Sequence, residues 1–167
     1  MEDSLIDNIL HVCKVLVTHS VEYLIVGGTA VALHGYYRQT RDSSGKIMEK
    51  HDLDFWYNPS YENYYNLLNA LEELGVDVAD FRSETTPTPK SSFFRFEYQN
   101  CSIDFLPEIP IDKSFRKSFI DRNVSRINSI DIPCIGYDDL IESKLATGRS
   151  KDIEDIKQLK LRRNNPE

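Results

Sequence analysis

The organisation of the chain follows from two stretches, YLIVGGTAVALHGYYRQTRD at residues 23–42 and DLDFW at residues 52–56. Residues 23–26 form a short apolar run rich in strand formers, which stops at Gly27 and Gly28. Residues 29–36 contain alanine and leucine and predict a short helix. Residues 52–57 begin with alternating polar and apolar side chains and predict another strand. The predicted order is therefore strand, glycine turn, helix and strand.

Three aspartates mark a candidate metal site. Side chains two apart on a strand point to the same face, so Asp52 and Asp54 project together. Neighbouring carboxylates repel each other, and keeping both ionised requires a cation, most simply Mg²⁺, which prefers oxygen ligands. An Asp-x-Asp pair alone fits a solvent-exposed strand edge equally well. Asp104 strengthens the metal hypothesis, because it lies between Ile103 and Phe105 on a predicted strand, where a lone carboxylate is unfavourable unless it is paired or metal-bound.

The glycine pair is a candidate phosphate-binding turn. Gly27 and Gly28 come directly after a predicted strand and before a predicted helix. This arrangement presents backbone N–H groups and a helix N-terminus to an anion such as a triphosphate. Thr29 adds a hydroxyl at the same place. A tight turn with no ligand is the alternative interpretation.

The rest of the chain completes a mixed α/β (α+β) fold whose strands do not alternate strictly with helices. A single domain spans residues 1–167, with its core at about 21–160. Pro133 indicates that the strands around it lie at a sheet edge. The predicted elements are helices over 3–18, 60–74, 115–122, 137–147 and 151–161, strands over 94–98, 101–106 and 124–135, and loops over 38–51 and 83–92.

Composition excludes several classes of protein. The 167 residues include 20 basic and 27 acidic side chains, a net charge of −7 that argues against a dedicated duplex-DNA binder. The three cysteines are far apart and indicate neither a disulfide framework nor a zinc site. No apolar run approaches the roughly 20 residues of a membrane helix. The acidic start, Met1-Glu2-Asp3, is unlike a signal peptide, so we expect a cytoplasmic protein.

The combination of a glycine turn, an Asp-x-Asp strand and a third aspartate resembles the polymerase-β-like nucleotidyltransferase superfamily. The stretches at 23–42 and 52–56 look like its small bacterial branch, which includes the AbiEii-type and MenT-type toxins. The C-terminal sequence DDLIESKLATGRSKDIEDIKQL, residues 138–159, also resembles that branch. The resemblance covers residues 23 to 159, which is most of the chain.

This resemblance implies a nucleotide site with Mg²⁺ (or Mn²⁺) as cofactor and an NTP as substrate. The third carboxylate of the family ligates metal and helps to deprotonate the acceptor hydroxyl, and a family lysine meets the nucleotide phosphates. An acidic residue in the closing helix belongs to the same set. Carried over residue by residue, the implied catalytic and metal residues are Asp52, Asp54 and Asp104, and the implied nucleotide-binding residues are Gly27, Gly28, Thr29, Lys144 and Asp152.

Two features depart from the family pattern. Gly28 and Asp52 are separated by 23 residues, about twice the usual spacing. Either the loop around residues 41–50 is an insertion, or the glycine turn of the family does not correspond to Gly27 and Gly28. Asp42 is a rival for the first carboxylate but has no partner two residues on. Little sequence follows the core, so the acceptor is expected to be small, held by a partner, or bound on the core itself.

We therefore expect a metal-dependent nucleotidyltransferase that transfers NMP to an acceptor hydroxyl and releases pyrophosphate. The acceptor remains open between the end of a tRNA, a small antibiotic and a partner protein. A toxin of this kind would have a cognate antitoxin as partner, whereas neither a membrane nor duplex DNA is expected. The alternative is a non-catalytic nucleotide- or partner-binding module of the same fold.

Overall fold

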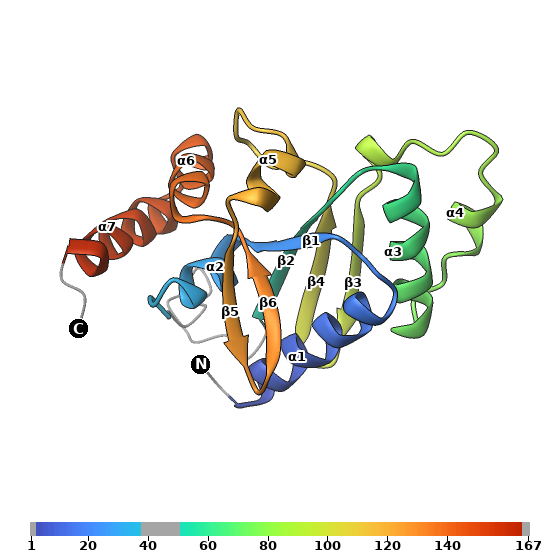
Figure 1. Cartoon of the computed structure of the whole chain (residues 1–167), viewed down its shortest axis with the longest axis horizontal. Helices are drawn as coiled ribbons and strands as arrows, with labels where there is room; N and C mark the ends of the chain where they lie inside the picture. The colour runs from blue at the N-terminus through green and yellow to red at the C-terminus, as the bar shows by residue number, and fades with distance from the viewer. Residues whose placement is uncertain (1–2, 38–50, 165–167) are drawn as a thin grey trace.

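The computed structural model describes residues 3–37 and 51–164 (Figure 1). The predicted loop at 38–51 falls outside these ranges except for His51, which begins a strand, and the rival Asp42 also lies outside them. Within the described residues, no helix is long and apolar enough to cross a membrane.

The centre of the molecule is a six-stranded mixed sheet with the order β3-β4-β2-β1-β6-β5. The pairs β2–β4 and β1–β6 are parallel, and the others are antiparallel. This arrangement confirms the predicted mixed α/β fold. The strands are β1 (Tyr23–Val26), β2 (His51–Tyr57), β3 (Phe94–Tyr98), β4 (Cys101–Leu106), β5 (Asn123–Ile127) and β6 (Ile130–Cys134).

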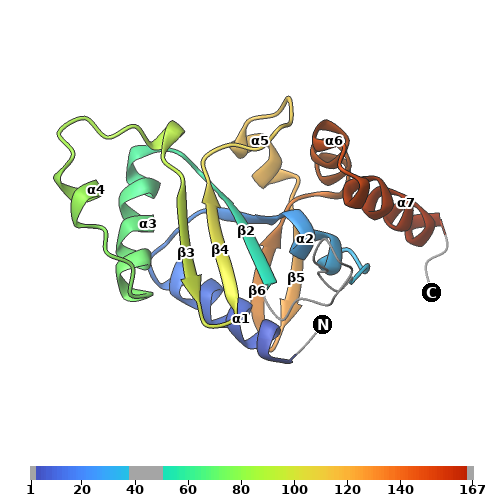
Figure 2. The same cartoon turned by 180° about the vertical axis from the view of Figure 1, so that it is seen from behind.

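Helices cover the two faces of the sheet unequally (Figures 1 and 2). On one face, α1 packs against α3 and β6. Helix α2 packs against β1 and β2 and also contacts α6. Helix α6 in turn packs against α7. The helices are α1 (Asp3–Thr18), α2 (Gly27–Leu33), α3 (Tyr61–Glu73), α4 (Ala79–Ser83), α5 (Phe115–Ile120), α6 (Tyr137–Thr147) and α7 (Ser150–Asn164), with a 3₁₀ turn, η1, at Pro89–Ser91.

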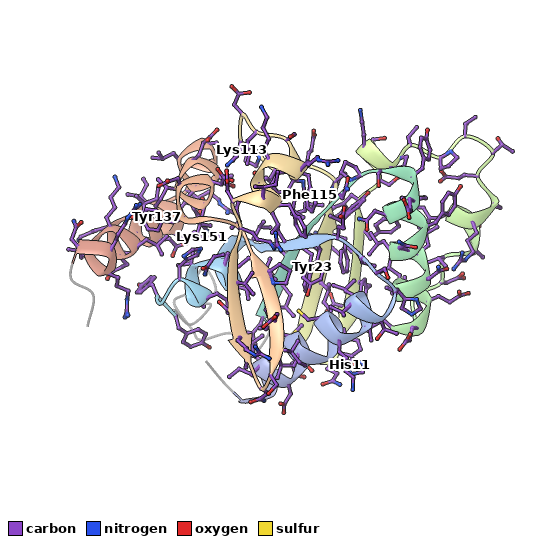
Figure 3. The ribbon with its side chains drawn as sticks, in the orientation of Figure 1. His11, Tyr23, Lys113, Phe115, Tyr137 and Lys151 are labelled. Atoms are coloured by element: carbon purple, nitrogen blue, oxygen red, sulfur yellow. The ribbon has the colours of Figure 1, made fainter. Side chains whose placement is uncertain are left out.

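The strand alternation decides which face becomes core. Leu53, Phe55 and Tyr57 are at most 1% exposed, and Phe55 stacks on Phe105 with ring centroids 4.9 Å apart. On the same face the ring of His11 from α1 stacks on Tyr98 (Figure 3). Burying these apolar side chains under α1 and α3 is the main stabilising contribution on this face. The intervening residues of β2, β3 and β4 consequently project from the opposite face.

Most of the sequence-predicted elements are confirmed, and their ends carry residues suited to those positions. The Ser60 side chain accepts a hydrogen bond from the backbone N–H of Asn63 at 3.2 Å and caps α3. Gly75 and Gly148 follow α3 and α6 with φ of +88° and +59°, a conformation that favours glycine.

Three details differ from the predictions. Helix α2 begins at Gly27 and ends at Leu33, rather than spanning 29–36, and the short α4 helix was not predicted. The prediction of edge strands over 124–135 holds for β5 and is wrong for β6, which lies between β1 and β5. Pro133 is tolerated in β6 because the pairing with β1 uses Cys134 and the N–H of Ile135, so the missing proline N–H is not needed there.

Candidate active site

Strand register places the predicted catalytic carboxylates in one row across the open face of the sheet. Arg95 on β3 is opposite Asp104 on β4, Asp104 is opposite Asp54 on β2, and Asp54 is opposite Val26 at the end of β1. Asp52 lies two residues before Asp54 on the same face. The structure therefore brings Asp52, Asp54 and Asp104 onto neighbouring strands.

Arg95 binds both oxygens of the third carboxylate, Asp104, through two nitrogens of its guanidinium group. Its Nε donates to Asp104 Oδ1 at 2.7 Å and its Nη2 to Oδ2 at 2.6 Å. The Asp104 side chain is 12% exposed, whereas that of Arg95 is 63% exposed. Two-pronged bonds of this kind are among the stronger charge-assisted hydrogen bonds. Sequence analysis missed Arg95, although the alternation of β3 places it on the same face as the carboxylates.

The surroundings of Asp54 disfavour the ionised form of its carboxylate. Burial and the negative charges of Asp104 and Asp52 together raise the pKa of Asp54 to about 6, against the opposing effect of Lys144 and Lys151. The described cations therefore do not balance the negative charge around this carboxylate. A divalent cation would relieve that imbalance, because it favours the ionised form of every carboxylate that binds it.

Gly27 lets the start of α2 approach Asp54. Its φ is +65°, and a Cβ at this position would overlap Asp54 Oδ2 and lie 3.1 Å from Cγ. Any side chain here would therefore displace the carboxylate. The Thr29 hydroxyl donates to the backbone carbonyl of Asp52 at 3.4 Å, which ties α2 to β2, while Gly28 is exposed beside it. The predicted glycine turn is thus the point where a helix meets the carboxylates.

Lys144 is a buried lysine held between two buried aspartates. Its Nζ lies 3.0 Å from Asp152 Oδ1 and 2.9 Å from Asp155 Oδ2, and only 5% of its side chain is exposed. Lys144 is therefore not a solvated helix lysine. Lys144 is nevertheless close enough to Asp54 for its charge to lower the pKa of that group.

Asp152 joins the ends of α6 and α7. Besides Lys144, it accepts hydrogen bonds from Thr147 Oγ1 at 2.9 Å and from Arg149 Nε at 2.7 Å. Although burial opposes ionisation, the bonds from Arg149, Lys144 and Thr147 hold the pKa of Asp152 well below its usual range. The Asp152 side chain is fully buried, and it holds Lys144 and Arg149 in position.

Two cations at the start of α7 complete the surroundings of the carboxylates. The positive charge of Lys151 lowers the pKa of Asp54, and the negative charge of Asp54 raises that of Arg149. The Arg149 side chain is 57% exposed and Lys151 is also exposed, so both are accessible to a ligand (Figure 3). Sequence analysis did not select either residue, although both lie in the segment that resembles the toxin branch.

The residue types at the site fit a divalent cation, but the described side chains do not already form a complete set of metal ligands. Mg²⁺ in phosphoryl-transfer sites commonly binds one or two carboxylates together with substrate phosphates. Asp52 and Asp54 can provide the two carboxylates. Among the described residues, no three His, Cys, Asp or Glu side chains already form a group that could hold a metal ion. Arg95 hydrogen-bonds both oxygens of Asp104, and each oxygen keeps a lone pair that can bind a metal, so Arg95 competes for the charge of Asp104 without blocking it.

Comparison with known proteins gives structural relatives only. No protein-family model matches the sequence, and no curated protein is found to be similar to it. The antibiotic-resistance factor ANT(2'')-Ia is similar in structure, with a TM-score of 0.59 and 16% identity over 95% of this chain and 84% of that chain. The lincosamide antibiotic adenylyltransferase LnuA, bound to lincomycin, gives 0.53 and 19% over 96% and 97%.

A Thermotoga maritima protein assigned as a nucleotidyltransferase is a third structural relative, with a TM-score of 0.57 and 16% identity over 95% of this chain and 94% of that chain. These alignments extend over nearly the whole of this chain and place its six-stranded mixed sheet in one architecture with theirs. The chain therefore has the fold of the nucleotidyltransferases.

Proposed function

We propose that the protein is a metal-dependent nucleotidyltransferase that transfers NMP from an NTP to an acceptor hydroxyl. The observation that carries this proposal is the row of Asp54 and Asp104 on paired strands, with Asp52 on the same face and Gly27 packed against Asp54. Carboxylates crowded in this way are unfavourable without a cation. In the reaction, the acceptor oxygen bonds to the α-phosphorus, the bond to the β-phosphate oxygen breaks, and pyrophosphate leaves.

The carboxylates have different roles in this proposal. Asp52 and Asp54 would hold Mg²⁺ or Mn²⁺, which neutralises charge on the phosphates when it is bound. Asp104 would accept the proton of the acceptor hydroxyl once Arg95 releases one of the Asp104 oxygens. Until then, Arg95 orients Asp104 through two short hydrogen bonds.

The triphosphate would lie between α2 and the start of α7. Arg149 and Lys151 supply exposed positive charge on that side, and buried Lys144 adds to the local potential. The backbone of Gly27 and Gly28, with the Thr29 hydroxyl, is the proposed phosphate-binding turn. Helix α2 has only 7 residues and a correspondingly small dipole, so the side-chain cations carry most of the attraction.

The acceptor is proposed from two directions. The resemblance to the AbiEii-type and MenT-type toxins favours a tRNA end, a cytoplasmic location and a cognate antitoxin. The structural likeness to an antibiotic-resistance factor and to a lincosamide adenylyltransferase favours a small-molecule hydroxyl instead. A partner protein is the third candidate acceptor.

One observation favours a second function, that of a non-catalytic nucleotide- or partner-binding module. Arg95 occupies both oxygens of the carboxylate that the reaction needs. A protein that bound nucleotide without transferring it could keep this contact permanently. Metal-dependent NTP binding fits both functions, whereas pyrophosphate release with an acceptor requires catalysis.

The test is a transfer assay with four α-labelled NTPs, Mg²⁺ and separate acceptor pools of total tRNA and small antibiotics. Transfer that is lost in Asp52→Ala and retained in the control Asp131→Ala would support the enzyme. Asp131 is an exposed aspartate on β6, paired with Arg126 at 3.6 Å and outside the carboxylate row. NTP binding without label transfer or pyrophosphate release from any pool would favour the binding module.

A further inference from the structure

A pocket of about 480 Å³ lies beyond the far end of α2, between the start of β5 and helices α6 and α7. None of the residues assigned to the nucleotide or metal site lines it. Its volume falls within the range of ordinary small-ligand sites, roughly 300–1,000 Å³. The lining residues that decide its chemistry are His34, Arg122, Tyr137, Leu159, Arg162 and Arg163.

The charge of this pocket is positive in a chain whose net charge is −7. Three arginines line the pocket, and the one carboxylate among the lining residues is Asp121. Its Oδ2 accepts a hydrogen bond from Lys113 Nζ at 2.7 Å, and Asp139 shares that lysine at 3.1 Å, so the charge of Asp121 is partly balanced outside the pocket. The arginine charges therefore outweigh the acidic charge at this place.

Arg162 and Arg163 are the arginines most available to a ligand, because Arg122 Nη1 donates to the Phe119 carbonyl at 2.6 Å and its guanidinium lies over the Phe119 ring. Within the described part of the chain, neither Arg122 nor Arg162 forms an ion pair. Arg163 lies 3.1 Å from Asp138, but the two side chains are 59% and 89% exposed, so this pair is weak and easily exchanged. Guanidinium groups bind phosphate oxygens through two parallel hydrogen bonds, which makes phosphate the best-matched anion.

The other lining groups suit a ligand that is more than a bare anion. The guanidinium of Arg163 lies over the Tyr137 ring at 4.4 Å, and the centroid of the His34 ring is 6.2 Å from that of the same tyrosine. His34 Nε2 donates to the backbone carbonyl of Ile135 at 2.8 Å, which fixes the imidazole. Leu159 adds a buried apolar surface. A sugar or base attached to a phosphate would contact these groups while the phosphate meets the arginines.

We propose that this pocket binds a phosphate ester and is the subsite for a phosphorylated acceptor. That it binds a phosphate ester stands on the pocket alone, whereas its assignment to the acceptor rests on the proposed function. Helix α2 starts against Asp54 and is followed by His34, about 10 Å farther on, and α7 carries Lys151 and Arg162 about 16 Å apart. The pocket is thus within the reach of an acceptor whose hydroxyl lies at the carboxylates.

This proposal separates the candidate acceptors by charge. An amino-sugar antibiotic carries ammonium groups, which the arginines would repel. A phosphorylated small molecule or the phosphate backbone of a nucleic acid carries the matching charge. Both sources present the same chemistry, and they differ in whether the phosphate is free or part of a chain.

The experiment measures binding to the full chain without NTP or divalent metal, so that transfer activity does not enter. The probes are ribose 5-phosphate and a four-residue single-stranded oligoribonucleotide, each beside its unphosphorylated equivalent, ribose or the nucleoside. The test variant is Arg162→Gln/Arg163→Gln. The matched control is Lys157→Gln/Lys160→Gln, which removes two positive charges from the same helix outside the pocket. Asp54→Ala serves as the variant of the nucleotide site.

We expect at least one phosphate probe to bind, the arginine double variant to lose about tenfold or more in affinity, and the lysine double variant and Asp54→Ala to bind as the wild type does. Equal binding of ribose 5-phosphate and oligonucleotide would identify a free phosphate ester, and binding of the oligonucleotide alone would identify a nucleic-acid backbone. The proposal is overturned if neither probe binds, if the two double variants lose affinity equally, or if Asp54→Ala abolishes binding. If the wild-type protein binds the probe but releases no pyrophosphate with any acceptor, the proposed function is refuted. The proposal that the pocket binds a phosphate ester is then still supported.

Discussion

The close approach of Gly27 to Asp54 makes a single methyl group a sharp probe of the site. Gly27→Ala adds a Cβ that would overlap Asp54 Oδ2 and lie 3.1 and 3.2 Å from Asp54 Cγ and Cβ. Of these three atoms only Oδ2 is close enough to force a change of position, whereas Cγ and Cβ need to shift by a few tenths of an ångström. The carboxylate must move away from its position in the row. A displacement of about 1 Å in a reacting group can cost on the order of 100-fold in rate.

The same substitution has a second cost that must be separated from the first. At φ +65° an alanine is strained by about 1–2 kcal/mol, which in a chain of this size lowers Tm by about 2–8 °C. Gly75→Ala is the matched control, because Gly75 has φ +88° and no atom within 4 Å of an added Cβ. It carries the conformational cost without the contact with Asp54.

We expect both variants to lose similar thermal stability and only Gly27→Ala to lose function. Mn²⁺ binding, followed by electron paramagnetic resonance, should weaken by about tenfold or more in Gly27→Ala and stay unchanged in Gly75→Ala. Transfer activity should fall by about 100-fold in the first variant and by less than about twofold in the second. Equal Mn²⁺ affinity and activity in the two variants would refute the idea that Gly27 positions Asp54.

Four further outcomes follow from the geometry. Arg95→Gln should tighten Mn²⁺ binding by about tenfold in a titration of the metal, because a positive charge that competes for Asp104 is removed; unchanged or weaker binding would contradict this. Lys144→Met should lower the free energy of unfolding by about 3–5 kcal/mol in urea, since it leaves Asp152 and Asp155 buried without their shared cation. The lowered pKa of Asp152 contributes stability that is complete above its unfolded value of about 4 and is lost as the pH falls through its folded value, so Asp152→Asn should flatten the decline of Tm below about pH 4. Removing divalent metal with EDTA should abolish transfer while leaving the far-ultraviolet circular dichroism spectrum unchanged, and transfer that survives EDTA would contradict metal dependence.

Local sequence patterns predict the elements of this fold well, because each pattern acts within a few residues. The alternation in β2 and the caps of α3 are visible without the rest of the chain. The order of the strands is different, since it depends on pairings between distant segments. Pro133 illustrates the limit: it indicates an edge strand, and only the single point of pairing between β1 and β6, at Ile25 and Cys134, shows why an interior strand accepts it.

The candidate site divides in the same way. Asp52 and Asp54 lie on the same face of the sheet because the side chains of a strand alternate between its two faces. The pairing of β2 with β4 then places Asp104 beside Asp54. Arg95 could be placed on the same face from its alternation, but its bond to Asp104 depends on the register of the hairpin. The burial of Lys144 could not be predicted from the surface-like composition of α6, because it arises only when α7 folds back and supplies its aspartates.

The junction of α6 and α7 links the two proposed sites. Asp152 binds Lys144 from α6 and Arg149 from the turn, so this buried ion-pair network fixes the direction in which α7 leaves the carboxylates. The same helix then carries Arg162 to the phosphate pocket. Loosening the junction with Lys144→Met should therefore weaken phosphate-probe binding as well as NTP binding. Replacing Arg162 and its neighbour should weaken only the phosphate probe, because these side chains lie at the far end of the helix. A Lys144→Met protein that remains folded and binds the phosphate probe with unchanged affinity would show that α7 is held in place by its apolar contacts alone.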